Sequence, residues 1–231
     1  MKPLRKVEIK WSPNFAYIVG LITSDGNLSN DGRHINFTSK DLGLAILFRR
    51  FLKIKNKTGK KGRSHDSKKK YFFIQFGDIN FYKFLVKIGL KPNKSKILTK
   101  LNIPRNYFFD FLRGMFDGDG SIFSYFDKRW KNSFVFYLTF SSASPSFIKW
   151  LRKNIEILIK IRGHINKTGS RSTIQLKYGK KESIILIRRM YYKKGLPFLI
   201  RKYRKIKRFL KVEKKIKVNV GRVLELVDSC V

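Results

Sequence analysis

Apolar and polar residues follow two rhythms along this chain, one helical and one extended. Residues 13–25 are apolar almost throughout and predict a helix, because Ser12 suits the N-cap, Pro13 the first helical position and Gly26 the stop after the last turn. Residues 33–40 alternate between two faces, with Ile35, Phe37 and Ser39 on one and Asn36, Thr38 and Lys40 on the other, and so predict a strand. One face of that strand is therefore expected to be buried and the other open.

The remaining segments follow the same two patterns. The first half continues with a helix, a basic hairpin and an amphipathic helix, at residues 41–53, 59–76 and 79–88. The second half repeats this plan after a helix that ends at Asp119, with a strand, a helix, a hairpin and a helix at residues 134–141, 145–159, 163–178 and 182–192. We therefore expect an N-terminal half at 1–90, a linker at 91–105 and a C-terminal half with a basic, initially helical tail at 106–231.

Two copies of one sequence pattern support this division. Residues 18–26, IVGLITSDG, return as residues 112–120, LRGMFDGDG. Three further echoes follow in the same order: FTS at 37–39 returns as FSS at 140–142, IQF at 74–76 returns as IQL at 174–176, and GL at 89–90 returns unchanged at 195–196. Four echoes in one order indicate a duplicated domain.

The charge balance of the chain indicates which classes of partner it binds. The chain has 231 residues with 53 Lys+Arg against 15 Asp+Glu, a net charge of +38. Such an excess of cations points to nucleic acid first and an anionic membrane second. Lys outnumbers Arg 36 to 17, so AT-rich codons offer an alternative source for part of this basicity.

Several classes of protein are excluded by residues that are scarce. Cys230 stands alone, so neither an intramolecular disulfide nor a cysteine zinc site is expected. The imidazoles His34, His65 and His164 are scattered, which argues against a histidine metal cluster or a Ser-His-Asp centre. The chain begins without a signal peptide and has no window apolar enough to span a membrane. A soluble, reduced, intracellular protein is expected.

The two repeated helices carry the candidate chemistry. Asp25 and Asp119 fall in their last turns, with Asp117 nearby, where the helix dipole disfavours an acid by a few tenths to about 1 kcal/mol. A bound divalent cation would reverse this effect. Mg²⁺ in particular uses few carboxylates together with waters and phosphate oxygens, which suits a pair of acids without His or Cys.

Small residues indicate how the two acids could meet. Gly20 and Ser24 lie four residues apart, as do Gly114 and Gly118, so each helix has a stripe of small residues on one face. If the stripes face each other, the two terminal acids end side by side. The alternative is a pair of ordinary core helices with Asp-Gly turns, but the recurrence at matching positions favours a shared site.

The two motifs resemble the signature motifs of LAGLIDADG homing endonucleases in their single-chain, two-motif form. The closer copy is FLRGMFDGDG at 111–120, whereas the first copy departs from the pattern at Thr23, a position that does not bind metal in the family. The resemblance implies an α+β fold of two pseudo-symmetric αββαββα halves. These halves form a saddle of antiparallel sheets that sits in the DNA major groove, with the motif helices at the domain interface.

The resemblance also implies a metal site and its surroundings. Asp25 and Asp119 match the metal-binding acids, with Ser24 and Gly118 beside them, for Mg²⁺ or Mn²⁺, and with Ca²⁺ as an ion that binds without supporting cleavage. A basic residue is expected near each scissile phosphate. Aligning the GL echoes pairs Lys96 with Lys202, and a shifted alignment pairs Lys94 with it instead. Many relatives have Gln where Ser39 and Ser142 stand, which leaves a water-positioning role unassigned here.

Polar strand faces and basic loops supply the expected DNA contacts. Residues on the polar faces are suited to base edges: Asn36, Thr38, Lys40, Gln75, Tyr137, Thr139, Ser141, Thr173, Gln175 and Lys177. Basic residues in the hairpin loops are suited to phosphates: Arg33, Arg63, Lys68, Lys69, Lys70, Arg129, Lys131, Lys167 and Arg171. The alternative is a merely solvated sheet face.

These features together predict a monomeric, Mg²⁺-dependent, site-specific double-strand DNA endonuclease. Its target would be long and pseudo-palindromic, and the enzyme would be encoded within an intron of an AT-rich genome, in an organelle or a prokaryotic cytoplasm. The alternative is an RNA maturase of the same fold that binds its own intron RNA without cleaving DNA. A basic structural protein would explain the charge but not the paired motifs.

Overall fold

The computed structural model describes residues 6–63, 66–129, 133–167 and 173–228. Within these ranges it describes side chains everywhere except at residues 63–70 and 216–228. The first half contains helices α1 (Pro13–Asp25), α2 (Leu42–Phe51) and α3 (Ile79–Lys87). Its strands are β1 (Gly26–Leu28), β2 (His34–Ser39), β3 (Gly59–Arg63) and β4 (Asp66–Gly77). The order along the chain is αββαββα.

The second half repeats that order. Its helices are α5 (Phe108–Asp119), α6 (Pro145–Ile159) and α7 (Lys180–Met190), and its strands are β5 (Ser121–Phe126), β6 (Phe134–Ser142), β7 (His164–Lys167) and β8 (Ile174–Tyr178). Three elements lie outside the repeat. Between the halves stand the short helix α4 (Lys94–Ile97) and the 3₁₀ turn η1 (Arg105–Tyr107), and the long helix α8 (Ile200–Asp228) follows the second half.

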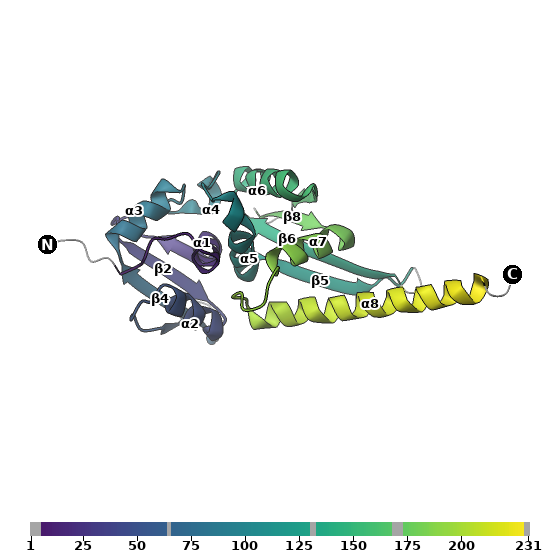
Figure 1. The fold of residues 1–231 in the computed structure, drawn as a ribbon. Coiled ribbons are helices and arrows are strands. Elements are labelled where there is room, and N and C mark those ends of the chain that lie inside the picture. The colour runs from purple at the N-terminus through teal and green to yellow at the C-terminus, as the bar shows by residue number, and fades with distance from the viewer. Residues whose placement is uncertain (1–5, 64–65, 130–132, 168–172, 229–231) are drawn as a thin grey trace.

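Each half builds one four-stranded antiparallel sheet, with strand orders β1-β2-β4-β3 and β5-β6-β8-β7. The sheets lie on either side of the α1–α5 pair, and α8 runs outward along the second sheet (Figure 1). The fold class expected from the sequence is thus confirmed, with both motif helices between the halves.

Apolar side chains on one face of each sheet pack against helices. In the first half the rings of Phe37 on β2 and Phe48 on α2 stack with centroids 4.4 Å apart. In the second half Phe136 on β6 stacks on Phe209 of α8, with centroids 3.5 Å apart. These contacts bury one sheet face and leave the other face for a partner.

The local structure departs from expectation at a few positions. Gly26 is extended, with φ −89° and ψ 160°, so it is not a left-handed helix stop. A Cβ there would lie 2.6 Å from the carbonyl oxygen of Ile22, so glycine is required by close approach. Gly120 repeats this in the second half, where a Cβ would lie 2.6 Å from the carbonyl oxygen of Phe116. The predicted linker also contains a helix, α4.

Candidate active site

Two glycines bring α1 and α5 into direct backbone contact. A Cβ on Gly20 would lie 2.9 Å from the amide nitrogen of Met115 and 3.0 Å from the Cα of Gly114. A Cβ on Gly114 would lie 3.0 Å from the amide nitrogen of Leu21 and nearer still to the carbonyl oxygen of Tyr17. The two stripes of small residues therefore face each other, and no larger side chain fits at the crossing.

The acids that end these helices meet at one end of the crossing. Asp25 and Asp119 line the same cavity of about 380 Å³, and a Cβ on Gly118 would lie 2.9 Å from Oδ2 of Asp25. Burial, followed by the charge of Asp119, raises the pKa of Asp25 to about 7. Asp119 reaches the surface, but protein surrounds much of its carboxyl, and this desolvation raises its pKa as well.

Neither carboxylate has a protein donor of its own. Within the described parts of the chain, no hydrogen bond or ion pair reaches Asp25 or Asp119. Two desolvated carboxylates that repel each other are poorly stabilised unless a cation joins them. Their oxygens are the ligands that hard divalent cations prefer, so the pair fits such an ion.

Two buried lysines partly offset the acidic charge. Lys202, which is 5% exposed, donates to the carbonyls of Phe116, Asp117, Gly118 and Gly120 at 2.6 to 2.9 Å and so caps the C-terminal end of α5. Lys94, which is 6% exposed, donates to the carbonyl of Gly26 at the end of α1. Burial lowers the pKa of each lysine to about 8, against the opposing pull of nearby acids.

The structure distinguishes the two lysine alignments. Lys94 and Lys202 occupy matching places below the two motif helices, as the shifted alignment expects. Lys96 is exposed on α4, because two residues along a helix turn the side chain to the opposite side. Pairing Lys96 with Lys202 is therefore not supported by this placement.

The cavities beside the acid pair are unequal. The cavity of about 380 Å³ includes Lys40, Tyr71 and Arg201, whereas one of about 240 Å³ on the other flank includes Ser142, Ala143 and Thr173. Ser39 and Ser142 hold matching positions in the two sheets, where they pair with Phe72 and Ile174. One position beyond these pairs, Lys40 therefore corresponds to Ala143, and Tyr71 to Thr173. At these matched positions the first flank thus has the larger side chains Lys40 and Tyr71, and the second flank has the smaller, uncharged Ala143 and Thr173.

A charged contact across the halves closes the first flank. Arg201 at the start of α8 donates through Nε to both oxygens of Asp41, the N-cap residue of α2, at 3.1 and 3.0 Å. This pair joins residues 160 positions apart. Sequence reasoning missed it, because no local pattern links the tail to α2.

The side chains adjoining the two acids are engaged in the fold. The Ser24 hydroxyl donates to the carbonyls of Gly20 and Leu21 at 3.3 and 3.1 Å within its own helix. The carbonyl of Gly118 accepts from Lys202 at 2.9 Å. In the described residues, moreover, no group of three or more His, Cys, Asp or Glu side chains could hold a metal. A bound ion would depend mainly on Asp25 and Asp119, with its remaining ligands from water or phosphate.

The third motif acid, Asp117, belongs to a buried structural network. Its Oδ2 accepts from the Tyr17 hydroxyl at 2.6 Å and from the amide of Leu199 at 2.7 Å. Next to it, the fully buried Arg113 donates to Asp110 at 2.8 Å and to the carbonyls of Met190 and Pro197. A charged residue inside an apolar motif was the available sequence signal for this network.

The expected base-reading residues lie on the open sheet faces. In the first sheet Asn36 pairs with Gln75 in register, and the Thr38 hydroxyl donates to Asn36 at 3.0 Å. In the second sheet Ser141 pairs with Gln175, and Thr139 with Lys177. Thr139 is an exception to the prediction, because it is buried and its hydroxyl donates to the carbonyl of Ser121 at 3.4 Å. It offers little surface to DNA.

The expected phosphate-contacting cations divide into three groups. Arg33, Lys40, Arg129 and Lys167 are exposed, although Arg129 is bonded to Asp127 at 2.8 Å. A second group lies in strands at positions whose side chains are not described: Arg63, Lys68, Lys69 and Lys70. The third group, Lys131 and Arg171, lies outside the described residues.

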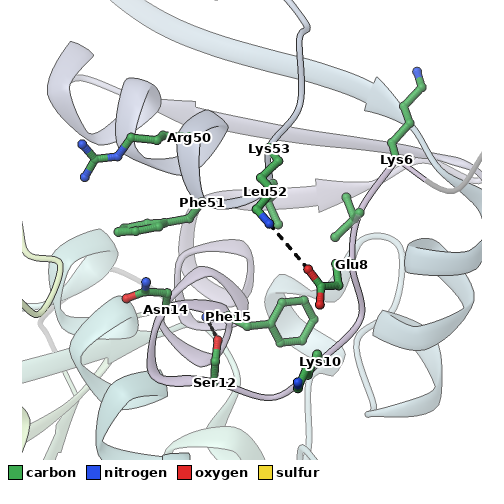
Figure 2. Close-up of a pocket in the computed structure, with 11 residues that line it drawn as sticks. Lys6, Glu8, Lys10, Ser12, Asn14, Phe15, Arg50, Phe51, Leu52 and Lys53 are labelled. Carbon is green, nitrogen blue, oxygen red and sulfur yellow. Dashed lines mark hydrogen bonds and ion pairs between the residues drawn. The ribbon is translucent and has the colours of Figure 1, made fainter.

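Another cavity, of about 440 Å³, lies at the opposite end of α1 (Figure 2). Lys6, Lys10 and Arg50 line it, and Lys53 pairs with Glu8 at 3.6 Å. About 18 Å of helix separates it from Asp25, at 1.5 Å per residue. It is therefore separate from the acid pair.

Comparison with known proteins agrees with this geometry. The family model of the LAGLIDADG-like domain matches residues 107–211, and no curated protein sequence matches the chain. The LAGLIDADG homing endonuclease I-GzeII, in complex with its DNA target, superposes with a TM-score of 0.61 and 13% identity over 91% of this chain and 92% of that one. I-SmaMI, bound to an uncleaved DNA target with calcium ions, gives 0.58 and 14% identity over 92% and 93%.

A third structure widens the comparison. Full-length DUF199/WhiA from Thermatoga maritima superposes with a TM-score of 0.55 and 17% identity, over 96% of this chain and 71% of that one. The family match covers the second motif helix, and the shared fold extends over both halves of the chain. Residues 107–211 of this chain therefore match the LAGLIDADG-like domain, and the chain shares its fold with solved LAGLIDADG homing endonucleases. Among its described residues, no helix is long and apolar enough to cross a membrane.

Proposed function

We propose that this protein is a site-specific double-strand DNA endonuclease of the homing type, encoded within an intron, that depends on a divalent ion. The observation that carries the proposal is the pairing of Asp25 and Asp119 at the foot of the glycine-lined crossing. Neither carboxylate has a protein donor among the described residues, and both pKa values are raised. A protein that only bound nucleic acid would gain nothing from these desolvated, mutually repelling acids.

The residues around the pair have distinct roles in this proposal. Asp25 and Asp119 would hold the ion, which supplies Lewis-acid polarisation of the phosphate and a more acidic bound water. Lys94 and Lys202 favour the ionised carboxylates by charge, since each lowers the pKa of both acids. The open sheet faces would place a DNA duplex so that its backbone passes over the acids.

The structural relatives support DNA as the partner. I-GzeII and I-SmaMI were each seen bound to a DNA target, the latter with calcium ions. The fold alone does not decide the activity, because WhiA shares it and is described by a LAGLIDADG domain rather than as an endonuclease. The proposal therefore depends on the acid pair as well as on the fold.

Sequencing of DNA ends tests the proposal. The full chain is incubated with intron-free genomic DNA of its host, with Mg²⁺ or with a chelator, beside the variants Asp25→Asn and Asp119→Asn. We expect one recurring staggered break that needs Mg²⁺ and falls roughly 10²–10³-fold in either variant, the scale for losing one transition-state contact. Asp127→Asn is a matched control, because this acid pairs with Arg129 in an exposed hairpin.

A different result would indicate the other function. If salt-sensitive binding persists and no break forms in any divalent ion, cleavage is ruled out and the RNA maturase becomes the better hypothesis. A break that survives both acid substitutions would place the chemistry elsewhere in the protein.

A further inference from the structure

The open face of the second sheet has an apolar outer end. Phe123 and Tyr125 on β5 are 54% and 49% exposed, although both are large aromatic side chains. Phe123 pairs in register with Tyr137, and Tyr125 with Val135. Directly paired residues share a face, so these four residues form one group, here named the outer apolar patch.

The patch continues the predicted reading face away from the acids. Ser121, one residue after Gly120, pairs with Thr139 on the same face, and the patch begins one pair further out. Strand β1 of the first half has no counterpart to it, because β1 ends at Leu28, which matches Ile122. The first half presents Asn36, Thr38 and Gln75 on its open face instead. The open faces of the two sheets therefore differ in strand length and in chemistry, because the second carries aromatic side chains where the first carries polar ones.

Exposed aromatic groups of this kind mark a surface that a partner covers. The rim of the patch carries a positive charge, because Lys177 places its Nζ 3.5 Å from the centre of the Tyr137 ring; Arg129 is exposed nearby and is paired with Asp127 at 2.8 Å. A polyanion is thus favoured over an apolar protein surface. The patch also includes Tyr137 on β6, which the sequence predicted to contact base edges.

The chemistry of duplex DNA then selects the contact. Bases in a duplex expose only their edges in the major groove, and the one apolar group there is the C5-methyl of thymine. Phe123 has no hydrogen-bonding group, so among the base edges of the major groove it is suited to this methyl group. Stacking on unpaired bases fits less well, because the rings of Tyr125 and Tyr137 are tilted by 43° with centroids 6.5 Å apart and Lys177 covers Tyr137.

We propose that the outer apolar patch contacts thymine methyl groups, so that the half-site bound by the second half carries A·T pairs at its outer positions. Phe123 and Tyr125 lie two residues apart on a strand, about 7 Å, which corresponds to roughly two base-pair steps. This inference rests on the proposed function, since it assumes that the sheets bind duplex DNA.

Selection from random duplexes followed by uracil substitution tests the proposal. The full chain selects binding sites with Ca²⁺ present, and single thymines of the best site are then replaced by uracil, which removes only the methyl group. We expect a loss of about four-fold in affinity per contacted methyl, the effect of one buried methylene, at outer positions of one half-site only. The double variant Phe123→Ser, Tyr125→Ser should bind more weakly and no longer distinguish thymine from uracil.

Phe126→Ser is the matched control. Phe126 lies on the same strand and is 58% exposed, but it pairs with Phe134 on the opposite face and contacts that ring with centroids 5.0 Å apart. The control should keep full discrimination. Equal thymine and uracil affinity in the unaltered protein, unchanged discrimination in the double variant, or preference for single strands would overturn the inference. Failure of the unaltered protein to bind any duplex would instead refute the proposed function.

Discussion

At the scale of single residues, Lys94 and Lys202 place positive charge at the ends of helices whose last residues are acidic. A cation is favourable near the C-terminus of a helix, whereas an acid is unfavourable there. In both motif helices the cation belongs to a distant segment of the chain and not to the helix itself. The ammonium of Lys202 has four carbonyl acceptors, more than its three protons can satisfy singly. This side chain thus both caps α5 and stabilises the acids.

We expect Lys202→Met to destabilise the protein. The substitution leaves buried carbonyls without a donor and should lower the free energy of unfolding by about 1–3 kcal/mol. Urea unfolding measures the change, with Lys205→Met as the control, because Lys205 is exposed on α8 and should change stability by less than about 0.5 kcal/mol. Equal stabilities of the two variants would show that the Lys202 contacts contribute little.

Asp25→Asn should have the opposite effect on stability in metal-free buffer. The pKa of Asp25 is raised to about 7, so between about pH 4 and 7 the folded protein keeps a proton that the unfolded chain has lost. Folding stability attributable to this group therefore falls as the pH rises through that window. Since Asp25 is partly exposed, we expect the variant to be more stable by only about 1 kcal/mol at pH 8, with the gain vanishing near pH 4.

Thermal unfolding in chelator at pH 4 and pH 8 measures this difference. Asp31→Asn is the control of opposite sign, because hydrogen bonds from His34 lower the pKa of Asp31 to about 2. Its stabilising effect is present above the ordinary carboxyl pKa and is lost as the pH falls towards 2. A loss of stability in Asp25→Asn at pH 8 would contradict the interpretation of the acid pair as unfavourable without an ion.

At the scale of elements, the α1–α5 crossing depends on residues too small to be replaced. We expect Gly114→Ala to lower the free energy of unfolding by about 1–3 kcal/mol or more, because its Cβ would overlap the backbone of α1 near Tyr17 and Leu21. Gly43→Ala on α2 is the matched control: a Cβ there meets nothing within 4 Å, and alanine favours a helix by up to about 1 kcal/mol. Urea unfolding should move the two variants in opposite directions, and similar losses in both would argue against the close crossing.

Elements with a strong local signal could be predicted from the sequence. Helices α1 and α6 begin at prolines behind serine caps that accept hydrogen bonds from Phe15 and Phe147, and both helices have the expected bounds. Strand β1 escaped pattern reasoning because three residues are too few for an alternation. Strand β5 escaped it because its outer residues are exposed on both faces.

In the candidate site, too, the residues within a local sequence pattern could be predicted, and those positioned by distant segments could not. The acids and glycines carry a local, repeated pattern, and sequence reasoning placed them together. The Arg201–Asp41 contact and the choice of Lys94 over Lys96 depend on how distant segments pack, so no local pattern contained them. Arg113 shows the same limit, because its acceptors at Met190 and Pro197 lie about eighty residues away.

At the scale of the whole molecule, the charge of +38 is distributed over faces with different roles. Exposed cations such as Lys40 lie beside the acid pair, whereas others lie on helices behind the sheets, as Lys149 does on α6. Only cations that face the duplex release counterions when DNA binds. Total charge therefore overstates the number of phosphate contacts.

The salt dependence of DNA binding counts those contacts. If the saddle neutralises 6–10 phosphates, affinity should fall by about 10³–10⁵ between 50 and 200 mM salt. Lys40→Gln should reduce the slope of log affinity against log salt by about 0.9, the value for one phosphate, because this residue lies at the acid pair. Lys149→Gln removes the same charge from behind the second sheet and should leave the slope unchanged. Equal slopes for both variants would show that DNA responds to the overall charge of the protein, and that the open sheet faces do not define where it binds.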